Sequence, residues 1–144
     1  MNDLKLEEVY FYLLERTVRQ FRKYSQALFT EHNIYISGDQ WVILKRISER
    51  EGINQKEIAD QTYKDPASVT RMLDLLEKQQ LVKRVAVEND RRTYALFLTE
   101  QGKELVTRIK PLATKARQKG LEGFNTDDHE RLKLLLNKIY ENLS

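Results

Sequence analysis

Apolar residues recur every three or four positions along most of the chain, and this spacing predicts amphipathic helices. The first such segment covers residues 6–31, with apolar positions at Val9, Leu13, Val18, Phe21, Tyr24 and Leu28. A second helix is expected between the N-cap residue Ser37 and Gly52, and its apolar positions are Trp41, Leu44 and Ile47. A third, short helix follows Asn54, which can cap it and forms a capping-box-like pair with Glu57.

The strongest helix start is Asp65-Pro66. Asp65 can accept the free amide protons of the first turn, and proline at the next position removes no hydrogen bond. The apolar stripe of this fourth helix is Val69, Met72, Leu73 and Leu76. Small residues, hydroxyls and an arginine lie on the other face, and these suit phosphates and base edges. The predicted groove-facing residues are Pro66, Ala67, Ser68, Thr70 and Arg71.

After Leu81 the pattern changes to a period of two, in which neighbouring residues face opposite sides. This pattern predicts two paired strands over residues 82–87 and 93–98. Residues 88–92 connect them, and Asn89-Asp90 supplies turn chemistry. Arg91 and Arg92 lie at or just beyond the tip, where they could project into solvent or into a DNA minor groove. Solvent exposure is likewise the alternative for Arg71, although the hydroxyls beside it favour contact with DNA.

Two further helices complete the pattern. Thr99 is expected to cap a helix over residues 100–119, in which Pro111 could introduce a kink. After a break bracketed by glycines, the last helix begins at Thr126, and its apolar stripe is Leu132, Leu135, Leu136, Ile139 and Leu143. The predicted fold class is therefore mainly α with a small β-hairpin (α+β).

Composition narrows the classes of function. The 144 residues are enough for one compact domain with a core, or for one domain plus an assembly element. The net charge of +3 permits a nucleic-acid partner without demanding one. The absence of cysteine excludes disulfides, thiolate metal sites and thiol redox switches. His32 and His129 lack metal-ligand spacing, so neither a metal nor another cofactor is expected.

The sequence also argues against an enzyme and against a membrane protein. The chain has no nucleophile motif, no phosphate-cradling glycine loop and no acid pair at a diagnostic spacing. Its first residues do not resemble a signal peptide, and no apolar run approaches the roughly 18 residues that a membrane span needs. We therefore expect a cytoplasmic protein that is not an enzyme.

Three features resemble the MarR family of winged helix-turn-helix transcriptional regulators. These are QKEIADQTYKDPASVTRMLDLLEKQQLVKR over residues 55–84, DRRTYALFLTEQG over residues 90–102, and the long first helix with two C-terminal helices. The resemblance spans the chain, residues 1–144. It implies a winged helix-turn-helix lobe over residues 37–99 and dimerisation helices over residues 6–32 and 104–143. Gln80 replaces the family's usual glycine, which suggests a slightly different end to the fourth helix.

The resemblance also implies a function. A homodimer would bind double-stranded DNA at a palindromic, inverted-repeat operator and act as a repressor. In the wing, Asp90 would pair with one arginine and fix the turn while the other enters the minor groove; Arg91 is favoured over Arg92 for that role. The alternative is a winged-helix module for protein or RNA contact.

A small-molecule effector is also compatible with the resemblance. Relatives often bind small aromatic or anionic effectors between the dimerisation and DNA-binding parts. Many aromatic residues lie in the first two predicted helices, where core and dimer packing explain most of them. Arg16, His32 and Trp41 are the candidate lining of an effector pocket.

Overall fold

The computed structural model describes residues 3–88 and 90–144, and the side chains of all of these except residues 90–92. A short 3-10 helix at Leu6–Glu8 precedes the first α-helix. The elements that follow are α1 (Tyr10–Glu31), α2 (Gly38–Glu49), α3 (Gln55–Thr62), α4 (Pro66–Lys78), β1 (Val82–Val87), β2 (Asp90–Leu98), α5 (Glu100–Gly120) and α6 (Thr126–Leu143). This order confirms the predicted mainly α fold with a β-hairpin wing.

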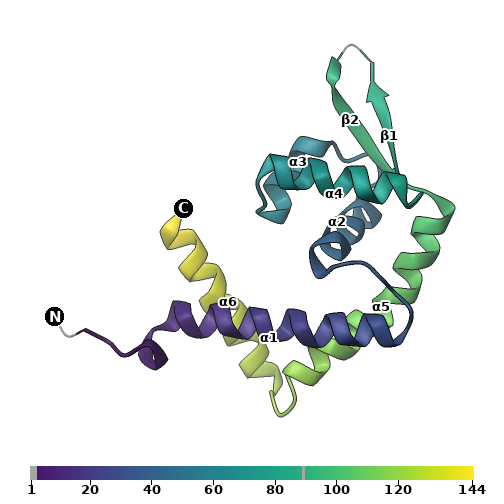
Figure 1. Ribbon diagram of the computed structural model, residues 1–144. Coiled ribbons are helices and arrows are strands. Elements are labelled where there is room, and N and C mark those ends of the chain that lie inside the picture. The colour runs from purple at the N-terminus through teal and green to yellow at the C-terminus, as the bar shows by residue number, and fades with distance from the viewer. Residues whose placement is uncertain (1–2, 89) are drawn as a thin grey trace.

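The helices form two parts, as Figure 1 shows. Helices α1, α5 and α6 make a base, while α2, α3, α4 and the wing form a lobe above one end of it. The core joins the lobe to α5 and to the end of α1 nearest the lobe. Its fully buried side chains include Phe29, Ile43, Leu44, Ile47, Ile58, Leu73, Leu76, Leu96 and Ile109. In the part of the chain that the structure describes, no helix is long and apolar enough to cross a membrane.

Side-chain caps set most helix starts. Each cap accepts a hydrogen bond from the backbone N–H three residues later, which satisfies an amide that the helix leaves free. The predicted caps Ser37, Asn54, Asp65 and Thr99 are confirmed. For the last helix Asn125 is the cap, and Thr126 is its first residue.

The N-terminal helix is shorter than predicted. Val9 is extended, with φ −88° and ψ 114°, and no side-chain bond caps the helix that starts at Tyr10. The preceding turn is held by the Lys5 N–H, which donates to Glu8 Oε2 at 3.1 Å. Helix α5, in contrast, continues through Pro111 to Gly120.

The wing is an antiparallel hairpin whose strands pair from Val82 opposite Leu98 to Ala86 opposite Tyr94. Beyond Ala86 the register shifts, and Val87 pairs with Asp90. Strand β2 therefore begins three residues earlier than predicted, so the backbone of residues 91 and 92 belongs to the strand rather than to the connection. The Gly52 N–H donates to Leu96 O at 2.8 Å, which anchors β2 to the lobe.

The corner between α4 and β1 corrects the expectation about Gln80. This residue takes the left-handed conformation that glycine usually supplies, with φ 62°. The Gln80 N–H donates to Glu77 O and the Leu81 N–H to Leu76 O, each at 2.9 Å. This pair of bonds is the Schellman motif, so the helix ends in the usual way without glycine. The backbone bonds are strong enough to impose the strained conformation on Gln80.

Candidate nucleic-acid interface

The exposed face at the start of α4 carries the predicted groove-facing residues. Asp65 caps the helix, Pro66 is its first residue, and Ala67, Thr70 and Arg71 are exposed. Arg71 Nη2 donates to Ser68 Oγ at 3.1 Å. Because a guanidinium has several N–H groups, the others remain available for a base or a phosphate.

The hydroxyls of Ser68 and Thr70 donate hydrogen bonds to residues at the start of α4. Ser68 Oγ donates to Asp65 Oδ2 at 2.6 Å, and Thr70 Oγ1 donates to Pro66 O at 2.9 Å. A hydroxyl has a single proton to donate, so in this arrangement neither can donate one to DNA. Thr70 Oγ1 also accepts from Gln55 Nε2 at 2.9 Å, which ties α3 to α4. That Ser68 and Thr70 contact DNA stays a prediction.

Asp65 stays ionised at neutral pH. The hydrogen bond from the Ser68 side chain lowers the pKa of Asp65 below its ordinary 3.8, and the bond from the Ser68 backbone and the nearby charge of Arg71 act in the same direction. A negative group at the start of α4 also interacts favourably with the helix dipole. The carboxylate is therefore a fixed acceptor at this end of the helix.

An ion pair that the sequence did not reveal joins the wing to α4. Arg84 Nη2, on β1, lies 2.7 Å from Asp74 Oδ1 and donates to Thr70 O at 3.4 Å. The Arg84 side chain is only 15% exposed. Strand alternation shows that Arg84 shares a face of β1 with Val82, but only the tertiary structure shows that this face meets α4. The wing and α4 are thus held together as one unit.

The side chains of Asp90, Arg91 and Arg92 lie outside the described residues, so their roles stay predictions.

The turn between α3 and α4 contacts α6 directly and is linked to α1 through α2. Tyr63 takes the left-handed conformation, with φ 58°, and its ring meets that of Tyr140 on α6 edge-on, with centroids 5.4 Å apart. Lys64 Nζ lies 2.8 Å from Asp39 Oδ1 on α2, and the same oxygen lies 3.3 Å from Arg22 Nη2 on α1. These contacts were not predicted. They connect the segment just before α4 with α1 and α6.

The predicted effector residues do not form one pocket. Arg16 and His32 are 16 positions apart along α1, which places them about 24 Å apart at 1.5 Å per residue. His32 Nδ1 is bonded to Leu28 O at 2.9 Å, and the His32 carbonyl accepts from Arg108 Nη2 at 3.1 Å. Trp41 packs against the core of the lobe. Within one chain the three residues therefore do not line a common pocket, because periodicity places residues on a helix face but does not limit their separation along it. An effector site stays a prediction.

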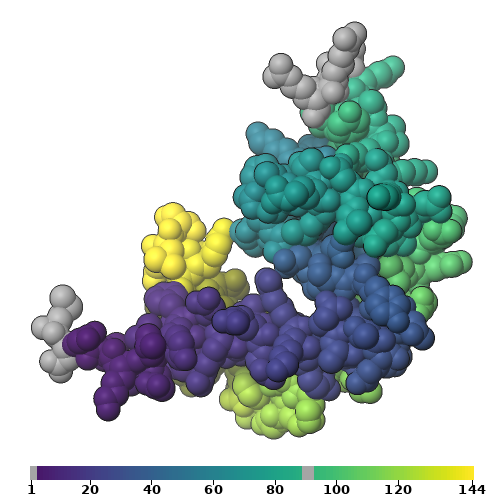
Figure 2. All heavy atoms as spheres, in the orientation of Figure 1, coloured from purple at the N-terminus to yellow at the C-terminus, as the bar shows by residue number. Residues whose placement is uncertain are grey.

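Arg16 instead lines a large apolar groove between α1, α5 and α6, of about 930 Å³. The other side chains around it include Val18, Phe21, Tyr24, Leu132 and Leu136. Helix α6 buries none of its residues within the chain. Its apolar stripe is exposed, and the exposed leucines are Leu132, Leu135, Leu136 and Leu143. In Figure 2 the C-terminal end of α6, in yellow, rises beside α1 toward the lobe, in agreement with the contact between Tyr63 and Tyr140. An amphipathic helix with an exposed apolar stripe indicates that something else covers it.

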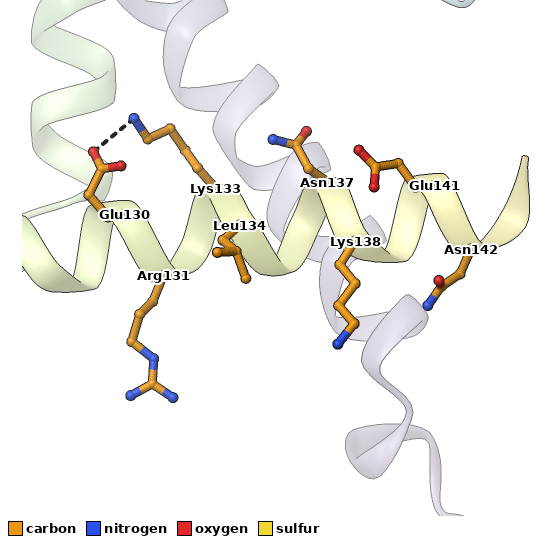
Figure 3. Close-up of a pocket in the computed structure, with 8 residues that line it drawn as sticks. All are labelled: Glu130, Arg131, Lys133, Leu134, Asn137, Lys138, Glu141 and Asn142. Carbon is orange, nitrogen blue, oxygen red and sulfur yellow. Dashed lines mark ion pairs between the residues drawn. The ribbon is translucent and has the colours of Figure 1, made fainter.

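The outer face of α6 has a different character. Figure 3 shows eight residues of this helix, among which Leu134 is the only apolar side chain. Lys133 pairs with Glu130 at 2.9 Å in the same view.

Across residues 3–88 and 90–144, there is no cluster of acidic and histidine side chains that could hold a metal ion.

Comparison with known proteins agrees with this geometry. The model of the MarR family matches residues 36–94. An organic hydroperoxide resistance transcriptional regulator of Bacillus subtilis (strain 168) is 30% identical over 140 residues, which cover 97% of this chain and 92% of the relative.

Two solved structures have a similar fold. Bordetella bronchiseptica BpsR, whose DNA binding is regulated by 6-hydroxynicotinic acid, superposes with a TM-score of 0.87 at 22% identity, covering 96% of this chain and 98% of that one. A mutant MarR from E. coli in complex with operator DNA gives 0.84 at 23% identity, covering 96% and 99%. The shared fold therefore extends over nearly the whole of each chain.

Proposed function

Because the chain belongs to the MarR family of transcriptional regulators, we propose that it is a repressor that binds an inverted-repeat operator as a homodimer. The observation that carries this proposal is the exposed Arg71 on α4, a helix to which the wing is joined through Arg84. Helix α4, the proposed recognition helix, would enter the major groove while the wing reaches the neighbouring minor groove. Arg91 and Arg92 remain the proposed minor-groove residues, with Asp90 shaping the turn.

The proposed homodimer rests on the groove between α1, α5 and α6. An exposed apolar surface of this size is unfavourable in water, and each methylene group that a partner covers contributes about 0.8 kcal/mol. A second copy could insert its own α6 there, which would cover the stripes of both helices around a two-fold axis. Two lobes related in this way would read two half-sites about one helical turn apart, or roughly 34 Å.

We also propose that a small aromatic or anionic effector releases the DNA, as 6-hydroxynicotinic acid regulates DNA binding by BpsR. The turn at Tyr63 and Lys64 supports this idea, since it joins the start of the recognition helix to α1, α2 and α6. An effector that changed those contacts would change the separation of the lobes. Its effect is limited by the difference in its affinity for the two arrangements.

Thiol oxidation is not a possible signal for this chain. The Bacillus subtilis relative is named for resistance to organic hydroperoxides, but the present chain has no cysteine. Without a thiolate there is nothing to form a sulfenic acid or a disulfide. Any regulation by a small molecule must therefore use binding or a different oxidisable group.

Selection of bound duplexes from a random DNA pool tests the function. We expect an enriched inverted repeat. Arg71→Ala should then weaken binding by about 1–3 kcal/mol and relax preference at the base pair it reads, whereas Arg91→Ala with Arg92→Ala should weaken all sequences more evenly and flatten the salt dependence. A double wing variant with wild-type affinity and salt slope would refute the wing assignment. Failure to enrich any repeat would favour the protein-contact or RNA alternative.

A further inference from the structure

We propose that Asp65 and Ser68 form a hydrogen-bonded chain that positions the guanidinium of Arg71 for reading a base pair. This inference rests on the proposed operator binding and adds the residues on which its sequence selectivity depends. Ser68 would act on DNA only through Arg71, as a positioning residue.

Residues 65, 68 and 71 are three apart, so their side chains share one face of the first turns of α4. Ser68 Oγ lies at the centre of the chain. It accepts from Arg71 Nη2 at 3.1 Å and donates to Asp65 Oδ2 at 2.6 Å. Each bond joins the hydroxyl to an ionised group, and such bonds are stronger than those between neutral partners. The serine thereby connects the carboxylate to the guanidinium.

This connection matters because an exposed arginine otherwise samples many rotamers. Ordering such a side chain on binding weakens an interaction by about two- to tenfold, and a side chain that is already held avoids this loss. The chain of bonds uses only part of the guanidinium, which leaves other N–H groups free to bond a guanine. Neither Ser68 nor Asp65 need touch the DNA for this effect.

The helix cap can be separated from the positioning. The Ser68 backbone N–H donates to Asp65 Oδ1 at 3.0 Å, and this is the bond that caps α4. Ser68→Ala removes the hydroxyl but keeps the backbone N–H, so the helix start is retained. Ser68→Thr keeps a hydroxyl at the same position. A matched control is Ser48→Ala on α2, whose hydroxyl donates to Lys45 O of the same helix at 2.6 Å.

The experiment measures the affinity of each variant for the selected operator, for operators with one base pair changed, and for a non-specific duplex. Ser68→Ala should lower discrimination by about two- to tenfold at the base pair where Arg71→Ala lowers it, with non-specific affinity unchanged. Ser68→Thr should restore discrimination, and Ser48→Ala should match the wild type. In the Arg71→Ala background, Ser68→Ala should have no further effect.

Two results would overturn the positioning role. One is full discrimination by Ser68→Ala; the other is an equal loss for every duplex, or an additive loss in the double variant. These outcomes are distinct from failure of the proposed function, in which the wild-type protein itself would select no duplex. If the wild type is selective and the double variant is additive, only the inference about Ser68 fails.

Discussion

Gly102 allows α5 to pack against the corner where the recognition helix turns into the wing, and we expect Gly102→Ala to be strongly destabilising. An added Cβ would lie 2.1 Å from Leu81 O and 3.4 Å from Leu98 Cβ. Ordinary contact starts near 3.4 Å, so the helix or the corner must move by about 1 Å. The corner cannot move freely, because Leu81 O accepts from the Thr99 N–H at 3.1 Å.

The magnitude follows from the bonds that such a movement would break. The Gly102 N–H donates to Thr99 Oγ1 at 3.0 Å, and Thr99 Oγ1 donates to Gln80 O at 2.6 Å. Losing the cap costs about 1 kcal/mol, and overpacking adds about 1–3 kcal/mol. Alanine returns roughly 0.5–1 kcal/mol because it favours helix over glycine. We therefore expect the free energy of unfolding to fall by about 1–3.5 kcal/mol.

Urea unfolding followed by circular dichroism would measure this loss, with all variants at one protein concentration because the proposed dimerisation would affect the apparent stability. Gly120→Ala is the matched control, since it is the same substitution on the same helix and nothing lies within 4 Å of the added Cβ. It should leave stability unchanged or raise it by up to about 1 kcal/mol. If Gly102→Ala proved as stable as Gly120→Ala, the packing argument would be refuted.

Four other expectations follow from single features. Leu136→Asp, in the groove, should shift sedimentation toward the monomer, whereas Leu134→Asp on the face shown in Figure 3 should leave a dimer; equal behaviour would contradict the proposed interface. Gln80→Gly should raise the free energy of unfolding in urea by about 0.5–1 kcal/mol, because glycine relieves the left-handed strain; a loss of stability would contradict this. Asp65 has a pKa that folding lowers, so its contribution to stability should be present above pH 3.8 and be lost as the pH falls through the lower folded value; an NMR titration giving a raised pKa would contradict it. An organic hydroperoxide should leave operator affinity unchanged in a gel-shift assay, and release of DNA would point to a target other than a thiol.

Local chemistry accounts for what could be predicted. The caps Ser37, Asn54, Asp65 and Thr99 were correct because a cap and its amide are three residues apart, so the sequence contains both partners. The stripe of α4 and the order of the elements were correct for the same reason, since periodicity is a property of neighbouring positions. The start of α1 was wrong because the apolar spacing continues through Val9 although the backbone there is extended.

Local geometry can still have several solutions. Ser68 and Thr70 were placed on the correct exposed side of α4, yet each hydroxyl could donate to DNA or to a neighbour three or four residues earlier. Gln80 was expected to alter the helix end, but the two backbone bonds of the Schellman motif stabilise it in the left-handed conformation.

The sequence alone was therefore sufficient for the family, the order of the elements, the caps of α2 to α5 and the face of α4 that carries Arg71. Contacts between distant segments were beyond its reach: Arg84 with Asp74, Tyr63 with Tyr140, and Gly102 against Leu81. Each depends on how the chain is folded back on itself, whereas hydrophobic periodicity and capping act within a few residues along it.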